Sequence, residues 1–529
     1  MPQIALLSVA LLTAWRPAET TAATPLVIAL AVLALVPWTH HRTAAGGLAR
    51  GWIVCTAVAA LALSAVGGED RANAAAELAL AVAVASLAWT ASREEAPERL
   101  QRLLALGLAA LALWALYQVT VGFDRAQLLV GTLPEALRVN AAERIASGRA
   151  FASLLLPGHL AVVLATALPI LAAAVRPSWR SAGWLAGALL CGVGLVLTRS
   201  PIGISLAVLA LAVLAARRRR ALLIAGLVAL AIGLVAVVAM RGDVGELEPL
   251  RLRADNWQTA VWAWQSSPLT GVGLGSYGQA TRAVPIEVGN LPAHAHSLPL
   301  EWLAELGVVG LLAAAAGAFW LAGLLRRLWP RRPELAVALA VVPLHNLVDF
   351  SLYTSGVAVP WAVLLGWGVA AARPDRPVIE RGLRRELLVA AASLAVAVTL
   401  LHLTSVTVEA AAGSAVAPEQ RVDGALEAQR LAPWRTTPPL LAAAAAVDTA
   451  DEERLAAAAA ALERGRWWRP QSAALAAAAA EVSLARGLVP TAAAGAWAAQ
   501  HLQPRSGDRR DAWAAFSTRL EAAGDAARP

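Results

Sequence analysis

Residues 182–216 read AGWLAGALLCGVGLVLTRSPIGISLAVLALAVLAA, and this stretch shows the pattern that decides the fold. Two apolar runs, Ala182–Thr198 and Pro201–Ala216, are separated only by Arg199 and Ser200. A helix needs about 20 apolar residues to cross a bilayer, with about 17 at the lower end of the range. The two runs therefore predict consecutive membrane helices joined by a short turn.

The rest of the chain repeats this pattern. Of 529 residues, 58% are hydrophobic and 15% are charged, and the mean hydropathy is +0.60. A water-soluble globular chain does not have this composition. The runs predict an all-α, polytopic transmembrane bundle of about 12–14 spans. The expected spans are Ile4–Trp15, Pro25–Trp38, Gly51–Gly67, Ala74–Ala91, Leu103–Phe123, Phe151–Val175, Ala182–Thr198, Pro201–Ala216, Ala221–Met240, Leu298–Leu325, Leu335–Leu352, Val357–Ala372 and Leu387–Leu403.

Arginines set the predicted orientation, because the chain contains no lysine and all 44 basic residues are arginines. Runs such as Arg217–Arg220 occupy loops that share one side under simple alternation of the spans. Positively charged short loops mark the cytoplasmic side. Loop arginines meet anionic lipid headgroups, so the net charge of +8 does not indicate a nucleic-acid partner.

The residues from Arg253 to Gly310 form a polar interruption on the predicted outer side, and we expect a catalytic loop over about 241–297. It contains GVGLGSYG, with Gly271 and Gly273. No strand-and-helix unit surrounds these glycines, which excludes a dinucleotide fingerprint. They predict a tight turn where the backbone approaches a ligand, with a simple loop crossing as the alternative.

Two histidines, His294 and His296, precede the expected span at Leu298. No cysteine or carboxylate triad nearby completes a metal site, so no metal or other cofactor is predicted. Imidazole titrates near neutrality, and one of the pair could take a proton from an incoming hydroxyl while the other is an exposed loop residue. Glu301 and Glu305 lie one helical turn apart on the next span, where Glu305 could orient polar neighbours.

Several arginines lie in outer loops, against the positive-inside bias. Guanidinium groups bind phosphate oxygens in pairs of hydrogen bonds, so these residues are candidates for binding an anion. Solvated side chains, or contacts with lipid headgroups, are the alternative. The candidates are Arg144, Arg149, Arg199, Arg251, Arg253 and Arg282.

His345 and Asp349 are four residues apart in the expected span Leu335–Leu352, so they should share one helix face. Ionisable residues inside a membrane segment are functional candidates by default. A satisfied structural hydrogen bond is the alternative, and we place the pair behind the residues that touch substrate.

Short motifs in this order resemble the O-antigen ligase and polymerase family. They are RxxxW at Arg253–Trp257, PxxGxG at Pro268–Gly273, the His-Ala-His motif, and ExG at Glu305–Gly307. GRAFASLLLPGHLAVVLATALP, LTRSPIG and HNLVDFSLYTSGVAVPWAVLLG add to the likeness, which spans about Arg144 to Gly368. The chain departs from the pattern at Ser297, where many relatives have Asn.

The resemblance implies a metal-independent glycosyltransferase in the bacterial inner membrane. An acceptor hydroxyl would attack an undecaprenyl-diphosphate-linked saccharide at the periplasmic face. Arg199 and Arg253 match the arginines expected to bind the diphosphate, and His296 matches the histidine expected to act on the acceptor. Arg149 matches less securely, and His294 could stand in for His296. Arg149, His294, Glu305, Gly271 and Gly273 are assigned to substrate binding.

The sequence after Leu403 changes character, which divides the chain into a membrane domain, 1–405, and a soluble α-helical repeat domain, 406–529. Pro433, Pro470 and Pro504 recur at spacings of 37 (470 − 433) and 34 (504 − 470) residues. A period of ~34 residues is typical of tetratricopeptide repeats. The predicted domain is periplasmic, and it either binds a protein partner or caps the membrane domain.

Two other functions fit parts of the pattern. A flippase or other transporter of lipid-linked glycans would also use a cavity lined by arginines, although internal repeats of the spans are not evident. A non-catalytic scaffold would use the C-terminal helices to assemble envelope proteins. The acceptor, which could be a lipid, a glycan chain end or a protein, does not follow from the sequence.

Overall fold

The structure is a computed structural model, and it describes most of the chain after residue 98. Leu11 and scattered positions between 74 and 92 are also described. The longer described ranges are 98–131, 135–154, 156–217, 248–281, 293–372, 404–502 with single-residue gaps, and 516–523. Helices connected by turns make up these ranges and no strand occurs in them, which confirms the all-α prediction.

Three helices in the described ranges are long and apolar enough to cross a membrane, namely Glu98–Val130, Pro157–Ala174 and Leu298–Leu328. Shorter apolar helices include α10 (Ala182–Thr198) and α11 (Pro201–Ala216), whose bounds match the predicted spans. Expected spans at 4–15, 25–38, 51–67, 221–240 and 387–403 lie wholly or almost wholly outside the described residues. The total number of spans therefore stays a prediction.

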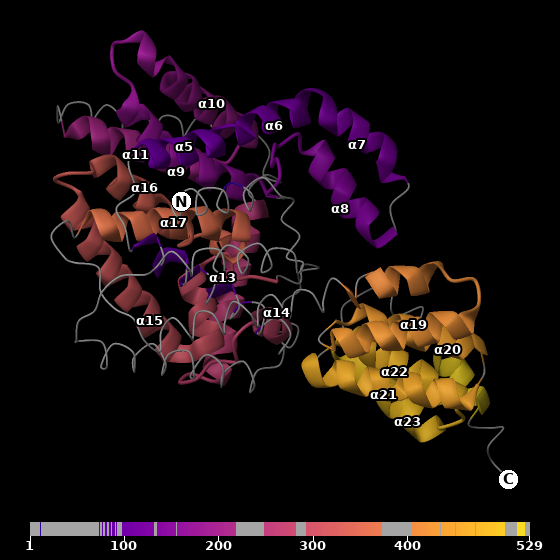
Figure 1. The fold of residues 1–529 in the computed structure, drawn as a ribbon. Coiled ribbons are helices and arrows are strands. Elements are labelled where there is room, and N and C mark those ends of the chain that lie inside the picture. The colour runs from indigo at the N-terminus through magenta and orange to yellow at the C-terminus, as the bar shows by residue number, and fades with distance from the viewer. Residues whose placement is uncertain are drawn as a thin grey trace, which may run out of the picture.

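Helix α9 (Pro157–Ala174) forms the centre of the membrane part and packs against α5 (Glu98–Ala109), α10, α11 and α16 (Figure 1). Its side chains are buried along most of its length, from His159 to Leu171. Small residues allow the close approach, because a Cβ on Gly203 of α11 would lie 2.3 Å from the Cβ of Ala161. Such contacts between small residues are a common basis of helix packing in membranes.

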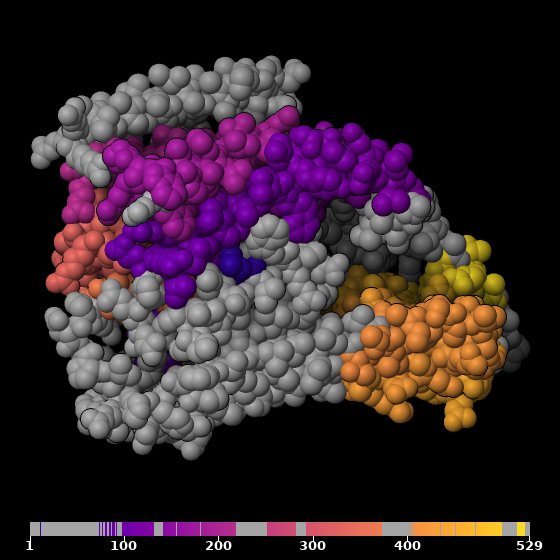
Figure 2. All heavy atoms as spheres, turned by 45° about the horizontal axis from the view of Figure 1, so that its top comes forward, coloured from indigo at the N-terminus to yellow at the C-terminus, as the bar shows by residue number. Residues whose placement is uncertain are grey.

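The expected span Leu103–Phe123 is part of a longer helical run. It comprises α5, α6 (Leu111–Tyr117), a π-helical turn (Gln118–Gly122) and α7 (Phe123–Val130). Its 33 residues reach about 50 Å, beyond the ~30 Å of a bilayer's apolar core. Helix α8 (Glu135–Ala146) then turns back against α7. Figure 2 shows this part as a purple surface that meets the magenta surface of α10.

The predicted catalytic loop at 241–297 contains a long helix, α13 (Glu248–Ser266), which was not predicted from the sequence, and its place outside the membrane stays a prediction. No glycine interrupts Glu248–Ser266, and its only proline, Pro249, lies in the first turn, where proline is tolerated. A turn and the short α14 (Tyr277–Ala280) follow. Helix α13 packs against α15 (Leu298–Leu328), which is interrupted at Gly307.

The expected span Leu335–Leu352 ends earlier than predicted. Helix α16 covers Pro333–His345, and a 3-10 turn at Ser351–Tyr353 leads into α17 (Ser355–Ala371). Asn346 closes the intervening turn, because its side-chain amide donates to the carbonyl of Val342 and accepts from the backbone N–H of Leu352. His345 and Asp349 are therefore not on one helix, which corrects that expectation.

The C-terminal part forms a stack of short antiparallel helices, in which each helix packs against the next (Figure 1). They are α19 (Pro418–Leu431), α20 (Thr437–Thr449), α21 (Glu452–Trp468), α22 (Ala473–Ala485) and α23 (Val489–Leu502). Alanine and leucine side chains fill its core, including Leu455, Leu462 and Leu475. Stacked helix pairs occur in several repeat folds, so the tetratricopeptide assignment and the boundary at 405 stay predictions.

Candidate active site

Helix α13 directs two side chains of the RxxxW motif toward the same region, since residues four apart share a helix face. A terminal nitrogen of Arg253, Nη2, lies 3.8 Å from Oδ2 of Asp349. The indole Nε1 of Trp257 donates to the backbone carbonyl of His296 at 3.3 Å. The motif thus joins α13 both to the loop that carries the histidines and to the turn after α16.

His294 is held in place by Glu301. Its Nδ1 lies 2.7 Å from Oε1 of Glu301, and the other carboxylate oxygen accepts the backbone N–H of Ala295 at 2.9 Å. The ring stacks on Phe350 and Tyr353 at centroid distances of 4.3 and 5.0 Å. These contacts fix the orientation of the His294 ring, and the choice between the two histidines as the residue that acts on a substrate stays a prediction.

His296 has a different environment. Its backbone is left-handed, with φ of 53°, and its ring meets the edge of Phe350 at 4.7 Å. Its Nδ1 is buried and has no hydrogen-bond partner among the described residues. Burial lowers the pKa of His296 to about 4, and the nearby Asp349 opposes that effect. At neutral pH the imidazole is therefore uncharged and able to accept a proton.

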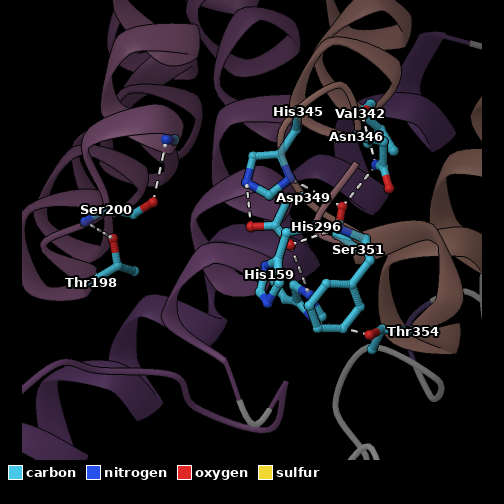
Figure 3. Close-up of polar contacts among 12 residues, drawn as sticks. His159, Thr198, Ser200, His296, Val342, His345, Asn346, Asp349, Ser351 and Thr354 are labelled. Atoms are coloured by element: carbon cyan, nitrogen blue, oxygen red, sulfur yellow. Dashed lines mark hydrogen bonds and ion pairs between the residues drawn. The ribbon is translucent and has the colours of Figure 1, made fainter. Parts of the chain in front are cut away.

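Asp349 collects several side chains that are far apart in the sequence (Figure 3). Its oxygens lie 3.6 Å from Nε2 of His159 and 3.8 Å from Nε2 of His345. Burial by itself would raise the pKa of Asp349, but the contacts with His159 and His345 and the N–H of Phe350 outweigh burial and hold the pKa below its usual range. A buried, ionised carboxylate therefore faces Arg253 and both rings.

Hydroxyl groups orient the two rings around Asp349. Thr354 Oγ1 lies 2.8 Å from Nδ1 of His159, and Ser351 Oγ lies 3.1 Å from Nδ1 of His345. Ser351 also accepts from the amide of Asn346 at 2.9 Å, so its own hydroxyl proton is available to His345. With both Nδ1 atoms bonded in this way, both Nε2 atoms can point N–H groups at the carboxylate.

Two predicted anion-binding arginines lie together at the adjoining ends of α8 and α10. Arg199 ends α10 with a left-handed backbone, φ of 47°, and its Nη1 donates to the carbonyl of Ser147 at 3.4 Å. Nε of Arg149 donates to the carbonyl of Thr198 at 3.1 Å. We call Arg149 and Arg199 the arginine pair. Figure 3 shows Thr198 and Ser200 of this region to the left of the Asp349 group, on a separate helix.

The glycines of PxxGxG contact protein rather than an open space. Gly271 and Gly273 have φ of 69° and 104°, and Gly273 donates its N–H to the carbonyl of Glu305 at 2.9 Å. A Cβ on Gly271 would lie 2.2 Å from the carbonyl carbon of Glu305. The side chain of Glu305 accepts the N–H of Tyr277 at 3.0 Å. Their substrate-binding role remains a prediction, whereas their packing role is visible.

Sequence reasoning missed His159 and Phe350, and it gave Asp349 a minor place. His159 belongs to the quoted segment GRAFASLLLPGHLAVV, where a histidine at the start of an apolar run was the available signal. Arg144 and Arg251 are exposed, and Arg282 lies outside the described residues.

In the part of the chain that the structure covers, no group of three or more His, Cys, Asp or Glu side chains is placed to hold a metal ion.

Residues 186–315 match the family model described as O-Antigen ligase. The matched region runs from α10 into α15 and includes Arg199, Arg253 and His296. No curated protein matches the chain.

The O-antigen ligase match supports that family and a membrane protein that processes glycans. It does not cover His159 or Asp349, which come from α9 and from the turn after α16. The fold therefore brings residues from outside the O-antigen ligase match to the same site.

Proposed function

We propose that the protein transfers a saccharide from an undecaprenyl-diphosphate donor to a hydroxyl acceptor at the periplasmic face of the bacterial inner membrane. The observation that carries this proposal is His296, an uncharged ring with a buried Nδ1 that has no partner in the described part of the site, beside the Arg253 and Asp349 contact. The O-antigen ligase match, which covers Arg253 and His296, supports a reaction on glycans. The proposal places the C-terminal helices in the periplasm.

In the proposed reaction, His296 removes the proton of the acceptor hydroxyl as its oxygen attacks the anomeric carbon. The bond between that carbon and the diphosphate oxygen breaks, and the lipid diphosphate leaves with the bonding electrons. Negative charge develops on the leaving oxygen, where arginine side chains stabilise it. Arg253 and the arginine pair supply these cations, and Asp349 fixes the direction of Arg253.

The reaction is tested with the purified full-length protein in liposomes, supplied with an undecaprenyl-diphosphate oligosaccharide. A ladder of products without added acceptor indicates a polymerase, and a single addition to a lipid or protein indicates a ligase. Movement of intact donor across the bilayer, with no change in its size, supports a transporter and contradicts the proposal. Product formed only after the C-terminal helices recruit another enzyme supports a scaffold.

Replacing Arg199 by methionine is expected to raise the KM for the lipid-linked donor by roughly 10- to 100-fold, since a hydrogen bond to a charged group contributes about 1.5–3 kcal/mol. Donor titration in the liposome assay measures the change. Arg217→Met is the matched control, because Arg217 lies at the opposite end of α11 and donates to the carbonyl of Pro330 at 2.8 Å. Equal effects of the two substitutions would contradict a donor-binding role for Arg199.

A further inference from the structure

A π-helical turn interrupts the long helical run at Gln118–Gly122, where the N–H of Phe123 bonds to the carbonyl of Gln118. Turns of this kind are rare, and inside α-helices they are frequent at functional sites. This turn contains Gln118, whose side chain is half-buried and directed at a distant segment of the chain. The turn therefore has a structural partner outside its own helix.

The side-chain oxygen of Gln118 accepts two backbone hydrogen bonds, from the N–H groups of Phe151 and Ala152, each at 2.9 Å. An amide oxygen has two lone pairs, and both are used here. Ala152 has φ of 49°, in the left-handed region that residues with a Cβ seldom adopt. Gln118 thus stabilises a backbone conformation that the local sequence disfavours.

Arg149 of the arginine pair lies two residues before Phe151, in the segment that Gln118 holds. The same segment contacts the end of α10, which carries Arg199. Ala150 donates its N–H to the carbonyl of Leu197 at 3.0 Å, and Arg149 donates from Nε to Thr198. Arg199 donates in return to the carbonyl of Ser147. The turn before α9 is therefore fixed on one side by the end of α10 and on the other side by Gln118.

We propose that Gln118 is a positioning residue for the arginine pair, which binds the diphosphate group of the donor. The inference rests on the anion-binding step of the proposed function. Guanidinium groups bind phosphate oxygens with a fixed geometry, so their backbones must be held in place. Gln118 provides that restraint without touching the anion.

The experiment measures binding of inorganic pyrophosphate to the purified full-length protein in detergent. Gln118→Met keeps the length of the side chain and removes the acceptor oxygen, and it is expected to weaken binding roughly tenfold, because the N–H groups of Phe151 and Ala152 lose their shared acceptor. Thr120→Val is the matched control in the same π turn, since within the described part of the chain the hydroxyl of Thr120 bonds to carbonyls of its own helix. The Thr120→Val variant should bind pyrophosphate as tightly as the unchanged protein does.

A double-mutant cycle separates positioning from a general loss of structure. If Gln118 acts through the arginine pair, Gln118→Met weakens binding less in the Arg199→Met background than in the unchanged protein. Glycine adopts positive φ readily, so Ala152→Gly should restore part of the binding lost in Gln118→Met. Additive effects in the cycle, unchanged binding by Gln118→Met, or no binding of pyrophosphate by the unchanged protein would each overturn the inference.

Glycan transfer is measured on the same preparations, which separates the two proposals. Pyrophosphate binding that depends on Gln118, with no transfer by the unchanged protein, would leave the inference standing and refute the proposed function. Transfer that survives Gln118→Met unchanged, together with unchanged binding, would refute the inference alone.

Discussion

Replacing His296 by alanine is expected to reduce glycan transfer by roughly 10²- to 10⁴-fold, the range that general acid or base catalysis contributes. The loss should appear in kcat, because the ring acts on the acceptor hydroxyl as the new bond forms. Single-turnover transfer from the lipid-linked donor measures it. The folded state should survive, since the loop keeps the bond from Trp257 to the backbone carbonyl of residue 296, which the substitution retains.

The neighbouring histidine provides the matched control. His294→Gln retains a donor for Glu301 and should lower transfer less than tenfold, because the ring of His294 is held by Glu301 and stacked on Phe350. His296→Gln should behave like His296→Ala, since an amide does not take up a proton. A larger loss in His294→Gln than in His296→Gln would reverse the roles of the two histidines.

The pH dependence of transfer gives an independent check on His296. A general base acts in its unprotonated form, and burial lowers the pKa of His296 to about 4. The active fraction is therefore complete above about pH 6 and falls as the pH drops through the folded-state value. Asp349 raises this pKa, so Asp349→Asn should move the acid limb of kcat/KM to lower pH. An acid limb centred near the ordinary pKa of imidazole would contradict a buried His296 as the general base.

The bounds of a membrane helix could be predicted from the sequence where a charged residue, a polar residue or a proline ends an apolar run. Both α10 and α11 have the predicted bounds, because Arg199, Ser200 and Pro201 separate two uninterrupted apolar runs. Helix α16 was predicted too long, since its end depends on side-chain hydrogen bonds of Asn346 that hydropathy does not report. Helix α13 was missed because its residues are mixed in polarity rather than apolar.

The candidate site was only partly predictable for a related reason. Arg253 and His296 stand in local motifs, so order and spacing were enough to select them. The contact between His159 and Asp349 joins α9 to the turn after α16, at a separation that no local pattern encodes. Phe350, which packs against His159, His294 and His296, looked like any other apolar residue near a membrane segment.

The break in α15 leads to the largest expected effect on stability. Gly307 has φ of 64° and ψ of −154°, a conformation that essentially only glycine adopts. A Cβ at this position would lie 2.4 Å from the backbone of Leu269, and the next residue, Val308, donates its N–H to the carbonyl of Pro268 at 3.0 Å. The break is where the glycine turn of residues 268–273 docks on α15.

Gly307→Ala should therefore lower the free energy of unfolding by about 3 kcal/mol or more, since it combines backbone strain with an overlap between two backbones. Gly317→Ala, in the same helix, is the matched control, because no atom of the described residues lies within 4 Å of the Cβ that it adds. In a helix interior, replacing glycine by alanine should raise the free energy of unfolding by up to about 1 kcal/mol. Thermal unfolding in detergent compares the two variants. Equal unfolding temperatures would contradict the requirement for glycine at position 307. His296→Ala should lose transfer and keep its unfolding temperature, whereas Gly307→Ala should lose both, because displacing the glycine turn also displaces Glu305 and the loop that carries the histidines.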